Sequence, residues 1–76
     1  MQVSVRLWGN LRRFAAEGRD AAIVQIGDGA TIEDLTMAMG AAHEVYAAAV
    51  NGKVVPLSTR LMADDRIFLF DHMHGG

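Results

Sequence analysis

Cysteine is absent from this sequence of 76 residues, and proline occurs once. The lack of cysteine excludes disulfide bridges, thiolate nucleophiles and cysteine-ligated zinc or iron–sulfur sites. A chain of this length lies near the limit of about 70–80 residues below which a single hydrophobic core is hard to stabilise. Because 51% of the residues are hydrophobic and 21% are charged, the composition nevertheless predicts one folded domain rather than a disordered chain.

Long apolar runs and a strong excess of one charge are missing as well. No apolar run approaches the roughly 18 residues of a membrane span. Met1 is followed by polar Gln2 and not by the charged and then apolar segments of a signal peptide. The net charge of −2 provides no basic surface for nucleic acid. We therefore expect a cytoplasmic protein with neither a membrane nor a nucleic-acid partner.

The sequence contains none of the common catalytic motifs. It has no Walker motif, dinucleotide-binding fingerprint, HExxH pair or Ser/His/Asp arrangement, and so short a chain has little material for the walls of a pocket. His72 and His74 are two residues apart, but a transition-metal site needs further ligands and none is adjacent. We therefore expect a carrier, a binding module or a subunit rather than an enzyme. We also expect no bound metal.

Hydrophobic periodicity predicts five strands and one main helix. Alternation of apolar and polar residues is typical of a half-buried strand, whereas apolar residues at i, i+3 and i+7 are typical of a helix with one buried face. The expected strands are residues 2–8, 21–26, 45–50, 53–55 and 66–70, the expected main helix is 32–39, and a short helix is expected over 11–17.

Capping and turn residues support two of these elements. Thr31 is the expected N-cap of the helix, with Glu33 and Asp34 in the first turn, where the helix dipole favours acidic residues. Both Met37 and Met39 are expected to pack as helix core residues. Asn51-Gly52 between two β-rich runs is the strongest short-range hairpin signal.

The order strand, strand, helix, strand, strand, strand predicts the fold class. The helix must lie across one face of the sheet to bury its apolar stripe, and the first and last strands are expected to pair in the middle. The prediction is an α+β protein with the β-grasp (ubiquitin-like) fold, in which a mixed four- or five-stranded sheet packs on one main helix.

Several segments of the chain resemble one family. Residues 5–15, VRLWGNLRRFA, resemble the opening of MoaD-type proteins, and residues 49–56, AVNGKVVP, resemble the central hairpin of ThiS-type proteins. Residues 61–70 are similar to the last turn and strand of both, and the sequence ends in Gly75-Gly76. The chain thus resembles the MoaD/ThiS family of ubiquitin-like sulfur carrier proteins over nearly its whole length.

The resemblance implies a carrier whose reactive group is its own C-terminus. A partner that resembles ubiquitin-activating enzymes, an adenylyltransferase, would use ATP to adenylate the carboxylate of Gly76, and sulfur would then replace AMP to give a thiocarboxylate. A downstream sulfur-accepting synthase would take the sulfur for molybdopterin or thiamine-type cofactor biosynthesis. Residues 1–71 would form the β-grasp domain and 72–76 a flexible tail, in which Gly75 passes through a narrow channel; no cofactor would be bound.

Two features of the residues leave alternatives open. Both faces of the last strand are apolar, so Phe68 and Phe70 either form a partner interface on the open side of the sheet or belong to the core. The Gly-Gly terminus also suits a ubiquitin-like protein modifier that is conjugated through Gly76, while a non-covalent β-grasp interaction module would have an inert tail. Which pathway would use the sulfur stays open.

Overall fold

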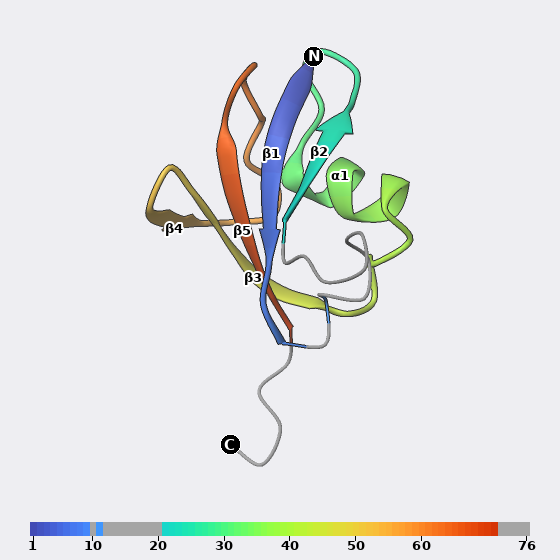
Figure 1. Ribbon diagram of the computed structural model, residues 1–76, viewed down its shortest axis with the longest axis vertical. Helices are drawn as coiled ribbons and strands as arrows, with labels where there is room; N and C mark the ends of the chain where they lie inside the picture. Colours follow the sequence, from blue (N-terminus) through green and yellow to red (C-terminus); the bar gives the residue numbers. More distant parts are fainter. Residues whose placement is uncertain (10, 12–20, 72–76) are drawn as a thin grey trace.

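The computed structural model describes residues 1–9, 11 and 21–71. Within these residues, five strands form one mixed sheet in the order β2-β1-β5-β3-β4, and the helix α1 packs on one of its faces (Figure 1). The elements are β1 (Gln2–Leu7), β2 (Ala21–Gln25), α1 (Ile32–Ala38), β3 (Val45–Val50), β4 (Lys53–Val55) and β5 (Arg66–Asp71). The predicted β-grasp fold is confirmed, and its sheet has five strands where four or five were expected.

The first and last strands lie side by side at the centre of the sheet. β1 and β5 pair in parallel, with Val5 opposite Ile67 and Leu7 opposite Leu69. All other described pairings, β1 with β2, β3 with β4 and β3 with β5, are antiparallel. The expected central position of the two terminal strands is therefore confirmed.

The hydrophobic core lies between the sheet and α1. Alternate residues of β1 and β5 point to this side, because successive side chains of a strand face opposite ways. They meet Ile32 and Leu35, both 0% exposed, from the helix. The strand residues of this core are Val3, Val5, Leu7, Val45, Ala48, Ile67 and Leu69.

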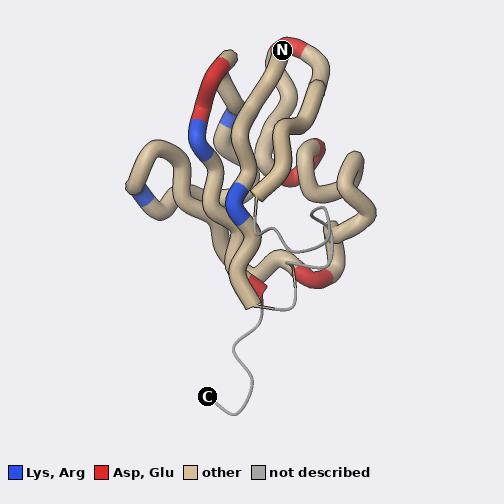
Figure 2. The backbone as a smooth tube through the Cα atoms, viewed as in Figure 1, with Lys and Arg blue, Asp and Glu red and all other residues tan. Residues whose placement is uncertain are grey.

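Charged residues are sparse on the strands and frequent in the turns (Figure 2). β2 and β3 contain none, and β1 contains Arg6 alone. β5 begins at Arg66 and ends at Asp71. No helix among the described residues is long and apolar enough to cross a membrane.

The predicted helix start is confirmed by a capping box. The Asp34 amide donates to Thr31 Oγ1 at 3.1 Å, and the Thr31 amide donates to Asp34 Oδ2 at 2.9 Å. Both bonds satisfy amide groups that have no partner in the first turn of a helix. At the other end, Gly40 has φ of +77°, a conformation that glycine adopts without strain and that ends helices.

One prediction on the helix is wrong. Met37 does not pack in the core but is 62% exposed, whereas Met39 is partly buried against the core as expected. Each helical residue turns by about 100°, so a residue two positions after buried Leu35 faces nearly the opposite way. Thr36 is buried instead, and its hydroxyl donates to the Glu33 carbonyl at 2.8 Å.

The predicted β3–β4 hairpin turns at Asn51 and Gly52, whose φ angles of 51° and 89° suit this residue pair. The Asn51 side chain also ties the turn to the start of β5. Its Nδ2 donates to Asp65 Oδ1 at 3.0 Å, and its Oδ1 accepts from the Arg66 amide at 2.9 Å. Asp65 further accepts from the Met62 amide at 2.8 Å.

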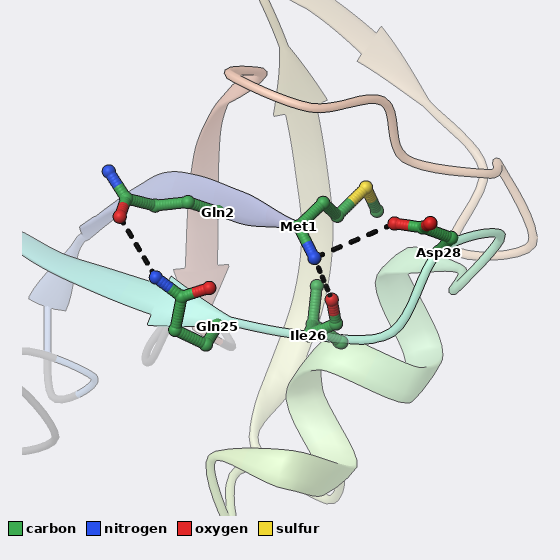
Figure 3. A network of polar contacts seen from close by, with 5 residues as sticks. All are labelled: Met1, Gln2, Gln25, Ile26 and Asp28. Atoms are coloured by element: carbon green, nitrogen blue, oxygen red, sulfur yellow. Dashed lines mark hydrogen bonds and ion pairs between the residues drawn. The ribbon is translucent and has the colours of Figure 1, made fainter.

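The ends of β1 and β2 meet in a second polar cluster (Figure 3). The Met1 ammonium group donates to the Ile26 carbonyl at 2.6 Å and lies 3.6 Å from Asp28 Oδ1. On the outer side, Gln25 Nε2 donates to Gln2 Oε1 at 2.9 Å. These contacts hold the β1–β2 pair together at the edge of the sheet.

Two expectations concern residues that the structure does not describe. The short helix over 11–17 lies outside the described residues apart from Leu11, which is fully buried in the core. The tail 72–76 also lies outside them, and the last described strand ends at Asp71.

Replacing Leu35 with Ala should lower the free energy of unfolding by about 2–5 kcal/mol, because it removes buried methyl groups and leaves a cavity. Met37→Ala, on the exposed side of the same helix, is the matched control and should change it by less than about 0.5 kcal/mol. Urea unfolding followed by circular dichroism measures both. Equal stability of the Leu35→Ala variant and the parent would contradict the core described here.

Candidate functional site

Phe68 and Phe70 lie on the face of the sheet that α1 leaves uncovered, here called the open face. Their neighbours Ile67 and Leu69 are buried on the other side, while both phenylalanines are half-buried. The two rings stack with centroids 4.9 Å apart and an interplanar angle of 12°. The outward orientation considered from the sequence is thus confirmed; the interface role of the two residues stays a prediction.

Trp8 extends this aromatic group beyond the end of β1. Its ring centroid lies 6.0 Å from that of Phe68 at an angle of 46°, and the side chain is 54% exposed. We call Trp8, Phe68 and Phe70 the aromatic patch. Exposed large rings in contact with one another are typical of protein–protein interfaces, where aromatic residues contribute much of the binding energy.

Small and apolar residues continue the open face on both sides of the aromatic patch. Ala47 pairs with Phe70 and Ala49 with Phe68, so methyl groups lie beside the rings. Farther out, Val54 opposite Ala49 is 70% exposed, and Ile23 on β2 is 63% exposed. On the β3–β4 side the apolar surface is contiguous, as at a binding face, whereas Ile23 is separated from the aromatic patch by Ser4 and Arg6 of β1.

A pocket of about 300 Å³ opens beside Phe68 on the open face. Its walls include Arg6 from β1, Arg66 from β5 and the hairpin residues Asn51 and Gly52. The guanidinium carbon of Arg6 lies 6.0 Å from the Phe68 ring centroid, within the range of a cation–π contact. Neither arginine stood out in the sequence as a site residue, because only the β1–β5 register brings the two to one pocket.

The end of β5, from which the tail continues, lies against the end of β1. Gly9 has φ of +65°, and a Cβ at this position would lie 2.5 Å from Asp71 Oδ1. Glycine is therefore required here both by the backbone conformation and by the close carboxylate. Asp71 is 9% exposed, so the last described residue is held inside the domain.

The other predicted site residues lie outside the described part of the chain. Gly75 and Gly76 belong to the segment 72–76, as do His72 and His74. Among residues 1–9, 11 and 21–71, no three His, Asp or Glu side chains are placed to hold a metal ion.

A β-grasp domain of this size defines a small ubiquitin-like protein. A family model described as the ThiS family matches residues 5–76. The chain therefore belongs to the ThiS family, within the MoaD/ThiS group of ubiquitin-like sulfur carriers that the sequence resembles.

Solved structures share this fold over the whole domain. SAMP1 from Haloferax volcanii has a TM-score of 0.75 and 24% identity over 100% of both chains. A candidate molybdopterin converting factor subunit 1 from Pyrococcus furiosus has a TM-score of 0.75 and 24% identity, over 96% of this chain and 99% of that one. A chain in the complex of molybdopterin-converting factor subunits 1 and 2 from Helicobacter pylori 26695 has a TM-score of 0.62 and 22% identity over 100% of both chains. No curated protein sequence matches significantly.

The two sides of β5 should respond differently to truncation. Leu69→Ala removes a side chain that is 0% exposed and should cost about 2–5 kcal/mol of unfolding free energy. Phe68→Ala removes a half-buried ring and should cost only about 1–2 kcal/mol, so the variant stays folded. Urea unfolding of both variants checks this order. A Phe68→Ala protein less stable than Leu69→Ala would place the ring in the core.

Proposed function

We propose that this protein is a sulfur carrier whose C-terminal Gly76 is adenylated by a partner enzyme and converted to a thiocarboxylate. The observation that supports this most directly is that the ThiS family match extends to residue 76 and so includes Gly75-Gly76. The protein acts as a co-substrate in this scheme, and ATP is used by the partner rather than bound by the carrier.

The chemistry explains why such a carrier needs activation. A carboxylate is a poor electrophile, because resonance and negative charge oppose attack at its carbon. In the proposed reaction the Gly76 carboxylate attacks the α-phosphate of ATP and pyrophosphate leaves. A sulfur nucleophile then attacks the carbonyl carbon of this mixed anhydride and AMP leaves, so that one hard step is divided into two easier ones.

The described domain has features that suit this role. The aromatic patch offers a docking face beside the end of β5, and glycine at position 9 allows Asp71 at that end to approach the end of β1 closely. Residues 71–76 span about 20 Å when fully extended, which is enough to reach a recessed active site on a partner. Glycines at 75 and 76 lack a Cβ and therefore fit a narrow channel.

Two classes of partner follow from the proposal. One is an adenylyltransferase that resembles ubiquitin-activating enzymes, and the other is a synthase that accepts the sulfur. The structurally similar Helicobacter pylori complex contains subunits 1 and 2 of the molybdopterin-converting factor, which supports a synthase subunit as the second partner. Molybdopterin and the thiazole of thiamine both stay candidates for the product.

A second candidate function is protein modification through Gly76. It is supported by the likeness of the fold to SAMP1, a small archaeal modifier protein of Haloferax volcanii. Incubation with the activating enzyme, ATP and a sulfur donor, followed by intact mass spectrometry, separates the alternatives. Replacement of one oxygen by sulfur supports the carrier, larger conjugates support the modifier, and an unchanged mass supports a non-covalent module with an inert tail.

Deleting Gly76 or replacing Gly75 with Val should leave the melting temperature nearly unchanged, because glycine has no side chain to bury and the end of a chain contributes little to the stability of a domain. The same changes should make ATP–pyrophosphate exchange, catalysed by the cognate adenylyltransferase, slower on the order of 100-fold. The reason is that a tail one residue shorter, or one with a Val side chain at position 75, misplaces the carboxylate.

The matched control is Ser58→Val, which adds the same side chain at an exposed turn of the domain and should exchange at the rate of the parent. Exchange at the parental rate by the protein without Gly76 would show that Gly76 is not the reactive terminus, and the carrier proposal would then fail.

A further inference from the structure

The open face has a charge opposite in sign to that of the protein as a whole. The chain has a net charge of −2, yet the described charged side chains on the open-face positions of the strands are Arg6 and Arg66. The described acidic residues lie in turns, on α1 or at strand ends (Figure 2). Asp71, the one acidic residue within a described strand, points to the buried side with Ile67 and Leu69.

Both arginines converge on the pocket beside Phe68. Phe68 pairs with Arg6, and Arg66 pairs with Ser4, so the two arginines stand two positions apart on neighbouring strands. The Phe68 ring lies 6.0 Å from the Arg6 guanidinium carbon, and the methyl group of Ala49 opposite Phe68 leaves space for a ligand.

The hairpin turn completes the pocket and is held in place from outside it. Asn51 and Gly52 form part of the wall. The Asn51 side chain is fixed by its bonds to Asp65 at 3.0 Å and to the Arg66 amide at 2.9 Å. Because these bonds also involve the start of β5, the wall and the backbone of Arg66 keep a defined relative position before any ligand binds.

We infer that this pocket receives the carboxylate of an aspartate or glutamate from a docking partner, within a segment whose neighbouring side chains are apolar. The carboxylate lies between the guanidinium groups of Arg6 and Arg66, and the apolar neighbours cover the aromatic patch. The inference rests on the proposed function only for the identity of the partner, the adenylyltransferase.

The composition of the open face favours an acidic protein segment over a polyanion. Nucleic acids are bound through many phosphate contacts, whereas this face has two described arginines and the chain has a net negative charge. A carboxylate is planar and suits the fork of a guanidinium group. The ring of Phe68 beside it reduces access of water, which strengthens a charge-assisted hydrogen bond.

Charge reversal tests the inference in the complete chain. Arg6→Glu and Arg66→Glu should each raise the KM for this protein in ATP–pyrophosphate exchange on the order of tenfold or more, with kcat little changed, because a like charge would face the partner's carboxylate. The parental KM should also rise with salt, and this dependence should weaken in both variants. Arg60→Glu, an identical change at an exposed arginine outside the open face, is the matched control and should keep the parental KM.

The outcomes separate the inference from the proposed function. If the parent is activated and both charge-reversed variants keep its KM, the pocket does not bind a partner carboxylate, while the carrier function stands. If Arg60→Glu raises the KM as much as they do, the effect is one of net charge and the inference is overturned. Absence of exchange with the parent itself would refute the proposed function.

A second measurement tests, in the absence of the enzyme, whether the pocket binds a carboxylate. ¹⁵N-labelled protein is titrated with a short peptide that alternates leucine and glutamate, and with its leucine–glutamine counterpart. The acidic peptide should shift the amide signals of Ala49, Gly52 and Phe68, while the neutral peptide and the Arg66→Glu variant should show no such shifts. Equal shifts with both peptides, or none with either, would overturn the inference.

Discussion

The parallel pairing of β1 with β5 is the interaction on which the rest of this structure depends. It joins the two ends of the described domain at the centre of the sheet, with Val5 opposite Ile67 and Leu7 opposite Leu69. Because side chains alternate along a strand, this one register decides which residues enter the core and which reach the open face. A shift by one residue would bury Arg6 and expose the core residues of β1.

The same pairing separates the residues that form the core of so small a protein from the residues of its open face. On β5, Ile67 and Leu69 pack against α1, while Phe68 and Phe70 form the surface of the opposite side. A chain of 76 residues has little core to spare, so a binding surface is best made from positions that the core does not use. Truncation of an open-face ring is therefore expected to affect folding less than truncation of a core residue on the same strand.

Close contacts occur at both ends of the central strand pair, where function is proposed. Asn51 and Asp65 hold the hairpin beside the start of β5, at the pocket of the arginines. Gly9 and Asp71 meet at its other end, where the tail begins. The proposed docking face and the end of β5 thus belong to one strand pair, so the proposal relates the site where a partner would bind to the region that the C-terminal carboxylate would reach.

Local signals in the sequence were sufficient for the helix start at Thr31, the hairpin at Asn51-Gly52, the order of elements and the family resemblance, because each depends on a few adjacent residues. Only the tertiary structure decided the orientation of Phe68, since both faces of its strand are apolar, and the exposure of Met37. The tertiary structure was also needed to place Arg6 near Arg66 in one pocket, and Gly9 near Asp71. These contacts join residues distant in the chain, and their geometry follows from strand register, which is set by the packing of the whole core.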